Sequence, residues 1–324
     1  MNPAPIFDCF FAYQKTAAMQ ASVDIGLFTS IGKESLSANA IAAKCHVPEK
    51  SARVLCDYWV VQGLLTKKGD TYALTPESAF FLDKSSPAYV GGVMGFLNGP
   101  ITPFFARLTQ AVRNGGCETE GSVQAEYDGW VPFAQDMGAM MFPAAKAIAG
   151  LLGPISGKVL DVAAGHGLFG IILAQQNKDL HVTALDWAKV LHVAKQNADH
   201  MGVGSRYSSI AGDAFEVDLK GPYDAILLTN LLHHFSKEKC TALLHRLRAV
   251  LRKGGTLVTL EFVPNEDRVS PPMSATFPLV MLATTAQGDA YTFREYEHML
   301  RATGFASNTL HQPQDVGQQI IISR

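Results

Sequence analysis

The sequence predicts an α/β protein with a doubly wound, mostly parallel sheet and a separate, mainly helical N-terminal domain. Three observations support this fold class. Strand-like and helix-like segments alternate from residue 158 onward, which is typical of parallel sheets with crossover helices. Two helical segments and a small hairpin occupy part of residues 5–92. A glycine turn, GHGLFG at 165–170, follows the first strand of the alternating part.

The composition indicates a large buried core and no polyanionic partner. Of 324 residues, 48% are hydrophobic and 17% are charged, which excludes global disorder and suggests about two domains. The net charge of −2 gives no general attraction to nucleic acid or to acidic membranes. The five cysteines are scattered, without C-x-x-C, so we expect no disulfide framework, no zinc site and a cytoplasmic location. The N-terminus does not resemble a signal peptide, and no stretch predicts a membrane span.

Residues 1–92 are predicted to form a winged-helix domain. Residues 36–47 and 48–65 predict two helices, the second with Pro48 near its start and Gly63 near its end. Residues 64–75 predict two short strands around a Lys-Gly-Asp turn. This pattern also occurs in DNA-binding proteins, but residues 1–90 carry eight basic and eight acidic side chains. Since a duplex binder needs a basic surface, we expect a dimerisation domain, with a DNA-binding regulator as an alternative.

The rest of the chain is predicted to divide into a helical bridge, residues 93–152, and an α/β domain, residues 153–324. The bridge is rich in Gly, Pro, Phe and Met, and we expect it to line a substrate pocket. In the α/β domain, the helix over 236–255 has one apolar face and is expected to stop at Gly254. The last two strands have no helix between them, which indicates an antiparallel hairpin at the sheet edge. Predicted strands span 158–164, 181–186, 207–213, 223–230, 256–262, 308–312 and 317–324, and predicted helices 167–176, 187–201 and 236–255.

Three acidic residues are predicted at the ends of consecutive strands: Asp161, Asp186 and Asp213. Ligands of such sheets bind beyond the carboxyl ends of the strands. There, a carboxylate would oppose a pyrophosphate in the glycine turn but would favour a cofactor with sulfonium and ammonium groups. Asp186 could then accept hydrogen bonds from ribose hydroxyls and Asp213 from an adenine amine. Ordinary surface acids, or the dinucleotide site of a nicotinamide-dependent oxidoreductase, are the alternatives.

On these residues, and on four further segments, the sequence resembles the class I S-adenosylmethionine-dependent O-methyltransferases. It is similar to the two-domain family that contains the caffeate, isoflavone and acetylserotonin enzymes. The resemblance covers nearly the whole chain. It implies a Rossmann-like methyltransferase sheet, S-adenosyl-L-methionine as cofactor, a small hydroxylated aromatic or polyketide-like acceptor, and a homodimer formed through the N-terminal domain. The four segments are AGDAF (211–215), LLTNLLHHFSKE (227–238), LVTLEFVP (257–264) and GDAYTFREYEHMLRATGF (288–305).

The resemblance also implies roles for individual residues. His233 is the expected general base and Glu261 the residue that orients it, since a neutral imidazole suits removal of a hydroxyl proton. The alternative is that His233 and His234 simply close a loop, and a metal site there is not expected. Met137 and Met281 would clasp the acceptor ring. The pattern of aromatic and methionine positions, which also includes Phe133 and Phe277, indicates an apolar pocket for a flat ring, with ordinary core packing as the alternative. The expected cofactor residues are Asp161, Gly165, Gly167, Asp186, Asp213, Ala214 and Thr229.

The sequence departs from the family pattern at several positions. Ala163 and Ala164 replace glycines, and we expect both to keep a β-region backbone. His234 replaces an aspartate. Ala290 replaces a second catalytic glutamate, and a capping box at 292–295 is expected to place Ala290 at the pocket rim, just before a helix. Because this glutamate is missing, the alternative is a family member that binds S-adenosylmethionine but acts as a decarboxylase or hydroxylase.

Overall fold

The computed structural model describes residues 1–119, 121–124, 126–314 and 316–324. These residues form two units, Met1–Gly99 and Pro100–Arg324. The finer division at residues 92 and 152 stays a prediction. In the described part of the chain, no helix is both long enough and apolar enough to cross a membrane.

The first unit contains the predicted helices and hairpin. Its sheet has the order β1-β3-β2 with antiparallel pairing, and the β2–β3 turn contains Gly69 in the left-handed region. The Trp59 side chain is fully buried and donates a hydrogen bond of 2.7 Å to the hydroxyl of Ser22. The elements are α1 (Ala4–Asp24), α2 (Leu27–Ile31), β1 (Leu36–Ser37), α3 (Ala38–Cys45), α4 (Glu49–Val61), β2 (Leu65–Lys68), β3 (Thr71–Leu74), α5 (Pro76–Phe81) and α6 (Val93–Phe96).

Helix α1 is longer than the sequence predicted. The expectation was of short helices only, but α1 has 21 residues. Its first half carries apolar side chains that remain exposed, among them Phe7, Phe10 and Phe11. Because these side chains pack against no core within the chain, they give no one-sided apolar stripe from which a helix could be predicted.

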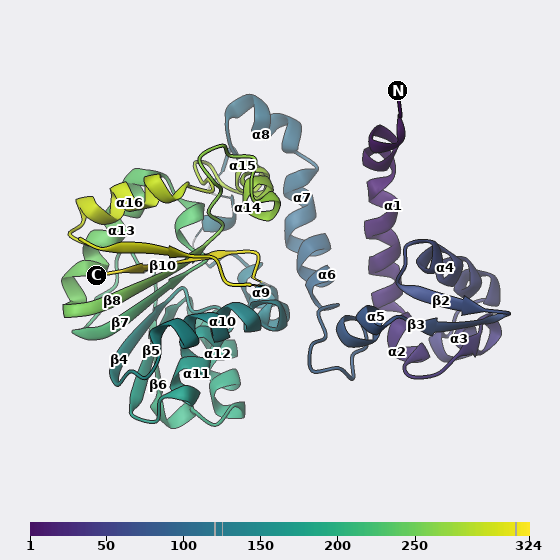
Figure 1. Cartoon of the computed structure of the whole chain (residues 1–324), viewed down its shortest axis with the longest axis horizontal. Coiled ribbons are helices and arrows are strands. Elements are labelled where there is room, and N and C mark those ends of the chain that lie inside the picture. Colours follow the sequence, from purple (N-terminus) through teal and green to yellow (C-terminus); the bar gives the residue numbers. More distant parts are fainter. Residues whose placement is uncertain (120, 125, 315) are drawn as a thin grey trace. The chain divides into compact units, whose positions relative to one another are not determined.

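The second unit is built on a seven-stranded sheet of order β6-β5-β4-β7-β8-β10-β9 (Figure 1). The pairs from β6 to β8 are parallel, whereas β10 is antiparallel to both β8 and β9. The predicted doubly wound sheet with an antiparallel edge hairpin is therefore confirmed. The strands are β4 (Gly157–Val162), β5 (Leu180–Asp186), β6 (Tyr207–Ala211), β7 (Tyr223–Thr229), β8 (Leu251–Glu261), β9 (Asn308–His311) and β10 (Gln319–Ser323).

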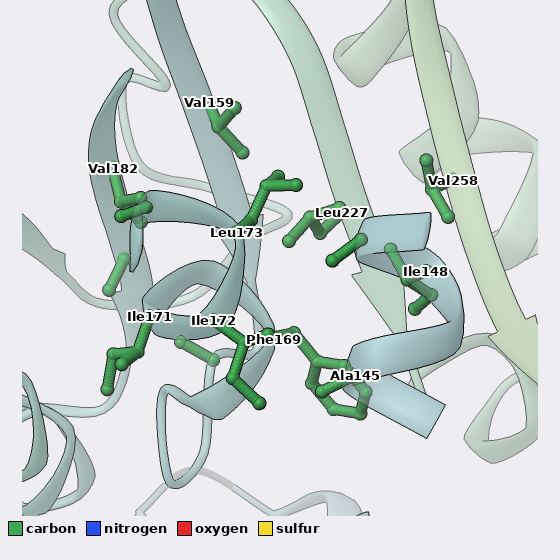
Figure 2. Packing of buried hydrophobic residues seen from close by; sticks show 14 of the residues in the cluster. Ala145, Ile148, Val159, Phe169, Ile171, Ile172, Leu173, Val182, Leu227 and Val258 are labelled. Atoms are coloured by element: carbon green, nitrogen blue, oxygen red, sulfur yellow. The ribbon is translucent and has the colours of Figure 1, made fainter. Parts of the chain in front are cut away.

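Helices cover both faces of this sheet. One face packs against α10 (Gly138–Leu152), α11 (Leu168–Gln176) and α12 (Ala188–His200). Figure 2 shows side chains of α10 and α11, such as Ile148 and Leu173, directed toward Val159 and Leu227 on the strands. The other face packs against α13 (Lys237–Val250) and α16 (Phe293–Ala302).

Several short helices connect these layers. They include α7 (Thr102–Phe105), α8 (Leu108–Asn114), α9 (Trp130–Asp136), α14 (Pro272–Thr276) and α15 (Pro278–Thr284). A π-helix spans Leu97–Ile101, and 3₁₀ turns span Gly121–Val123, Gly204–Arg206 and Leu232–His234. The last of these, η4, directly follows β7 and contains both neighbouring histidines.

The predicted end of α13 at Gly254 is wrong. The helix ends at Val250, and β8 begins at Leu251, which pairs with Tyr223 of β7. The apolar pattern of the helix continues through Leu251, but the backbone of Leu251 is already extended, with ψ of 131°. Pairing with the neighbouring strand therefore ends the helix, ahead of Gly254 and Gly255.

Candidate active site

The glycine turn connects β4 to α11 and requires glycine at two positions. Gly165 and Gly167 have φ values of 56° and 75°, a region that residues with a Cβ atom adopt at a cost. A Cβ atom on Gly167 would lie 2.5 Å from the hydroxyl oxygen of Tyr207. At Gly165 a Cβ would meet nothing nearer than Phe133, at 3.8 Å, and the Ala163 carbonyl oxygen, at 4.0 Å. The turn is therefore tightly packed at Gly167 and leaves the backbone approachable at Gly165.

The prediction that Ala163 keeps a β-region backbone is wrong. Ala163 has a φ of 54°, which places an L-residue in the left-handed region at a cost of about 1–2 kcal/mol. Ala164 does not share this conformation, and its N–H donates a 3.1 Å hydrogen bond to the Leu185 carbonyl. Ala163, which stands where the family has a glycine, is thus strained, because the chain must turn sharply after β4 to reach Gly165.

Asp161 lies beneath the turn and is fully buried. Its Oδ2 accepts a 3.1 Å hydrogen bond from the N–H of Gly170, in the first turn of α11. Its Oδ1 has no partner among the described residues, and neither has the buried hydroxyl of Tyr207. Burial raises the pKa of Asp161 well above its usual range. Asp161 therefore supports the turn from below, and its expected part in cofactor binding stays a prediction.

Asp186 joins the turn to the start of α12. Its Oδ2 accepts a 2.9 Å hydrogen bond from the N–H of Gly165, and its Oδ1 accepts one of 2.7 Å from Trp187. Burial raises the pKa of Asp186 to about 6. Each oxygen of an ionised carboxylate can accept more than one hydrogen bond, so Asp186 retains acceptor capacity for a ligand.

The remaining predicted cofactor residues follow the neighbouring strands. Asp213 is half-buried two residues beyond β6, and its Oδ1 accepts a 2.8 Å hydrogen bond from the N–H of Phe215. Ala214 is buried, and Thr229 is buried at the last position of β7. The Gly212 N–H donates to the Asp186 carbonyl at 3.0 Å, which brings the segments after β5 and β6 together.

Glu261 and His233 form a fully buried pair at the ends of β8 and β7. Nδ1 of His233 lies 2.5 Å from Oε2 of Glu261. The other carboxylate oxygen, Oε1, accepts hydrogen bonds from the N–H groups of Leu231 and Leu232, at 3.0 and 2.8 Å. Glu261 therefore fixes both the η4 backbone and the orientation of the His233 ring. Since a carboxylate only accepts, it favours the tautomer with the proton on Nδ1 and leaves Nε2 free as a base.

Aromatic rings surround the His233 ring. Phe277 lies edge-to-face with it, at a centroid distance of 4.9 Å. Phe262 stacks on Phe277, with centroids 3.8 Å apart. The sequence prediction included Phe277 but missed Phe262, although Phe262 directly follows Glu261 at the end of a strand. These rings form an apolar wall beside the base.

A second aromatic series approaches from α9. The Trp130 ring lies 5.4 Å from that of His234 and 5.6 Å from that of Phe133, edge-to-face in both cases. Phe133 in turn lies against the glycine turn at Gly165. The predicted residue Phe133 thus lies beside the expected cofactor turn, and Trp130, which the sequence prediction missed, connects it to the histidines.

Met137 and Met281 lie in the helical segments that also carry Phe133 and Phe277. Met137 lies at the junction of α9 and α10 and packs against the core cluster beneath the sheet. Met281 is buried in α15, four residues after Phe277, and therefore on the same side of the segment that carries Phe277. Their proposed contact with an acceptor stays a prediction.

The expected position of Ala290 at a pocket rim is wrong. Ala290 is fully buried, two residues before Thr292, the N-cap of α16. The capping box is confirmed: the Thr292 hydroxyl accepts from the Glu295 N–H, and the Glu295 carboxylate accepts from the Thr292 N–H. The preceding residue, Asp289, donates its N–H to the His233 carbonyl at 2.9 Å. The segment therefore supports the histidine turn through its backbone.

The site as a whole combines a buried imidazole, a carboxylate that orients it, and an approachable glycine turn. In the described ranges, no group of three His, Cys, Asp or Glu side chains could hold a metal ion. Such an arrangement can remove a proton from a hydroxyl held in an apolar pocket beside a nucleotide-derived cofactor.

Comparison with known families matches both parts of the chain. Residues 144–306 match the O-methyltransferase domain, and residues 7–84 match the O-methyltransferase dimerisation domain. The second match covers most of the first unit, including the greater part of α1.

Individual relatives extend over almost the whole chain. A solved structure described as a candidate O-methyltransferase from Nostoc punctiforme is 45% identical, covers 100% of this chain and 99% of its own, and superposes with a TM-score of 0.96. The tetracenomycin polyketide synthesis 8-O-methyl transferase of Streptomyces glaucescens is 26% identical over 94% of this chain and 91% of its own. Human N-acetylserotonin methyltransferase in complex with S-adenosylmethionine is 22% identical, with a TM-score of 0.86 over 99% and 96% of the two chains.

Proposed function

The chain belongs to the O-methyltransferase family, and from this premise we propose how its residues carry out the transfer. It is an S-adenosylmethionine-dependent O-methyltransferase. The comparisons give no support to the alternatives of a decarboxylase or hydroxylase, a nicotinamide-dependent oxidoreductase or a DNA-binding regulator. The observation that carries the proposed mechanism is the His233–Glu261 pair, buried beside an aromatic wall.

The residues around the glycine turn fit S-adenosylmethionine, which supplies a methyl group on a positively charged sulfur. Gly165 leaves the backbone approachable, and Asp186 retains acceptor capacity for ribose hydroxyls. The only basic side chain within the turn is that of His166. Its Nδ1 accepts a hydrogen bond from the Leu168 N–H, and burial lowers the pKa of His166 to about 4. His166 is therefore neutral near pH 7 and does not repel the sulfonium.

We propose that His233 is the general base. Its Nε2 takes the proton of the acceptor hydroxyl while the oxygen forms a bond to the methyl carbon, and the carbon–sulfur bond breaks as that bond forms. Oε2 of Glu261 holds the Nδ1 proton and stabilises the imidazolium that results. Glu261 is a positioning residue, since it acts only through His233. Holding oxygen, carbon and sulfur in line can contribute several kcal/mol to lowering the barrier, on the order of 7–11 in well-oriented systems.

The proposed acceptor is a small aromatic or polyketide-like compound with a free hydroxyl. Phe262 and Phe277 support this class, because their rings offer a flat apolar surface next to the base. We place Phe133, Met137 and Met281 in the same pocket. The names of the relatives point to the same chemistry: one acts in tetracenomycin polyketide synthesis and another on acetylserotonin.

We further propose that the protein is a homodimer formed through its first unit. The match of residues 7–84 to the dimerisation domain supports this, as do the exposed phenylalanines of α1, since isolated proteins rarely expose such clusters. A cytoplasmic location is the accompanying proposal, in keeping with five cysteines that are all free.

The function is tested with S-adenosylmethionine labelled on its methyl group and a panel of phenols, naphthols and hydroxylated polyketide analogues. Matched aniline and thiophenol analogues serve as controls. We expect label transfer to hydroxyl compounds only, with S-adenosylhomocysteine as inhibitor. Transfer to nitrogen or sulfur acceptors alone, or failure of the protein to bind S-adenosylhomocysteine in calorimetry, would contradict the proposal.

A further inference from the structure

His234 carries a ring nitrogen that the fold leaves without a partner. The residue is 8% exposed, and its Nδ1 is buried with no hydrogen bond to any described residue. An unpaired polar group in such a place destabilises the folded protein. Buried polar atoms in native proteins are nearly always paired, so the exceptions call for a partner that the chain itself does not supply.

The ring adjoins both His233 and the aromatic series that reaches the glycine turn. Its centroid is 4.3 Å from that of His233 and 5.4 Å from that of Trp130. Trp130 contacts Phe133, and Phe133 lies against Gly165 of the glycine turn. A molecule whose hydroxyl reaches both His233 and the methyl donor must therefore pass close to His234.

The fold does not need the His234 ring to hold the histidine turn. The His234 N–H donates to the Leu231 carbonyl at 3.1 Å, and the Cys240 thiol donates to the Leu232 carbonyl at 3.1 Å. These bonds, together with the carboxylate of Glu261, fix η4 through its backbone. The ring lies against those of Trp130, His233 and Phe235.

The His234 ring is uncharged in this environment. Burial, and then the neighbouring His233, lower the pKa of His234 well below its ordinary value. A neutral imidazole carries one N–H and one lone pair. It can therefore accept a hydrogen bond from a hydroxyl or donate one to a carbonyl, according to the tautomer that the ligand selects.

We propose that His234 is a specificity-determining residue whose unpaired Nδ1 hydrogen-bonds a second oxygen of the acceptor, next to the hydroxyl that His233 deprotonates. Because the two histidine rings lie 4.3 Å apart, their targets lie on neighbouring positions of one aromatic system. The acceptor class is thus an aromatic diol with adjacent hydroxyls, or a phenol beside a carbonyl. This inference rests on the proposed function of the same site.

The test compares a vicinal naphthalenediol with the corresponding naphthol, which differs only by the second oxygen. Turnover of both is measured for the wild type, for His234→Phe, which fills the space without a polar atom, and for His234→Asn, whose amide can replace Nδ1. We expect the wild type to favour the diol in kcat/KM by about tenfold or more, as one buried hydrogen bond allows. His234→Phe should lose this preference by weakening the diol alone, and His234→Asn should keep most of it.

Binding of both compounds to the S-adenosylhomocysteine complex is measured in parallel by calorimetry. This separates the inference from the proposed function. If neither compound is methylated but the diol binds more tightly and loses that advantage in His234→Phe, the inference stands although the reaction does not. The inference would be overturned if the wild type bound both compounds with equal affinity. It would also be overturned if His234→Phe lost affinity for the diol and the naphthol to the same extent. The exposed His245→Asn serves as the matched control.

Discussion

In the proposed mechanism, His233 is the residue on which the reaction depends most directly. Replacing it by alanine removes the base but leaves the glycine turn and Asp186 intact, since neither contacts His233. We expect kcat to fall by about 10²- to 10⁴-fold, the usual contribution of a general base, with unchanged affinity for S-adenosylhomocysteine. The exposed His245→Ala should retain full activity. Undiminished turnover of a hydroxyl acceptor by His233→Ala would show that another group removes the proton.

From the proposed contact between Asp186 and the cofactor, we predict that cofactor binding depends on pH. Burial raises its pKa to about 6, so the carboxyl is mostly protonated at pH 5 and ionised at pH 7. Hydrogen bonds to an ionised acceptor are about twice as strong as neutral ones, so affinity for S-adenosylhomocysteine should increase as pH rises through that range. Calorimetry should show this increase in the wild type and in the control Asp218→Asn. A similar increase in Asp186→Asn would assign the effect to another group.

The alanine pair before Gly165 allows a matched comparison of backbone strain. Ala163→Gly removes the strain of a left-handed alanine, which costs the folded state about 1–2 kcal/mol. The same change makes the unfolded chain more flexible, which lowers stability by about 0.4–1 kcal/mol. It should therefore be neutral or stabilising in urea unfolding. Ala164→Gly has only the second effect, together with a lost buried methyl group, and should destabilise. The reverse order of stability would mean that the turn differs from the one described.

At this scale the sequence predicted which residues reach the strand ends but not how each one is placed. Asp186, His233 and Glu261 could be located because each follows an apolar run that forms a buried strand. The strain at Ala163, the position of Asp161 beneath the turn and the burial of Ala290 could not. They depend on the path of the backbone after the strand, which apolar patterning does not encode.

Among the elements, the start of α16 is the one that the sequence predicted most accurately. Its capping box links Thr292 and Glu295, and the adjoining segment supports the His233 carbonyl through Asp289. Thr292→Ala should lower the free energy of unfolding by about 1 kcal/mol, as loss of an N-cap hydroxyl usually does. Thr292→Ser, which keeps the hydroxyl, is the control. If urea unfolding gives both variants the same stability, the cap contributes little.

Elements were predictable where local chemistry and packing agree. Side chains such as Leu243, Leu244 and Leu247 mark the buried face of α13, and all three are fully buried. The end of α13 was missed because pairing of Leu251 with a neighbouring strand ends the helix. The length of α1 was missed because its apolar side chains are exposed and form no buried stripe. Both depend on features that local sequence patterns do not encode.

For the whole molecule, the exposed rings of α1 predict a dimer. Phe7, Phe10 and Phe11 are 49%, 64% and 53% exposed and contact one another. Light scattering should give a dimer for the wild type, and replacing the three residues by serine should shift the mass toward the monomer. Val269→Ser, at an exposed apolar residue of the second unit, should have no effect. A monomeric wild type, or a dimer that survives the triple substitution, would contradict this interface.

The central claim is that Glu261 holds His233 in the tautomer with a free Nε2. Glu261→Gln tests it directly, because the amide oxygen can still accept from Leu231 and Leu232 while its NH₂ group faces Nδ1. The His233 proton must then move to Nε2, where it blocks the base. We predict that kcat for methyl transfer falls by about 10²- to 10⁴-fold, with unchanged thermal stability and cofactor affinity. Wild-type turnover by this variant would contradict the account.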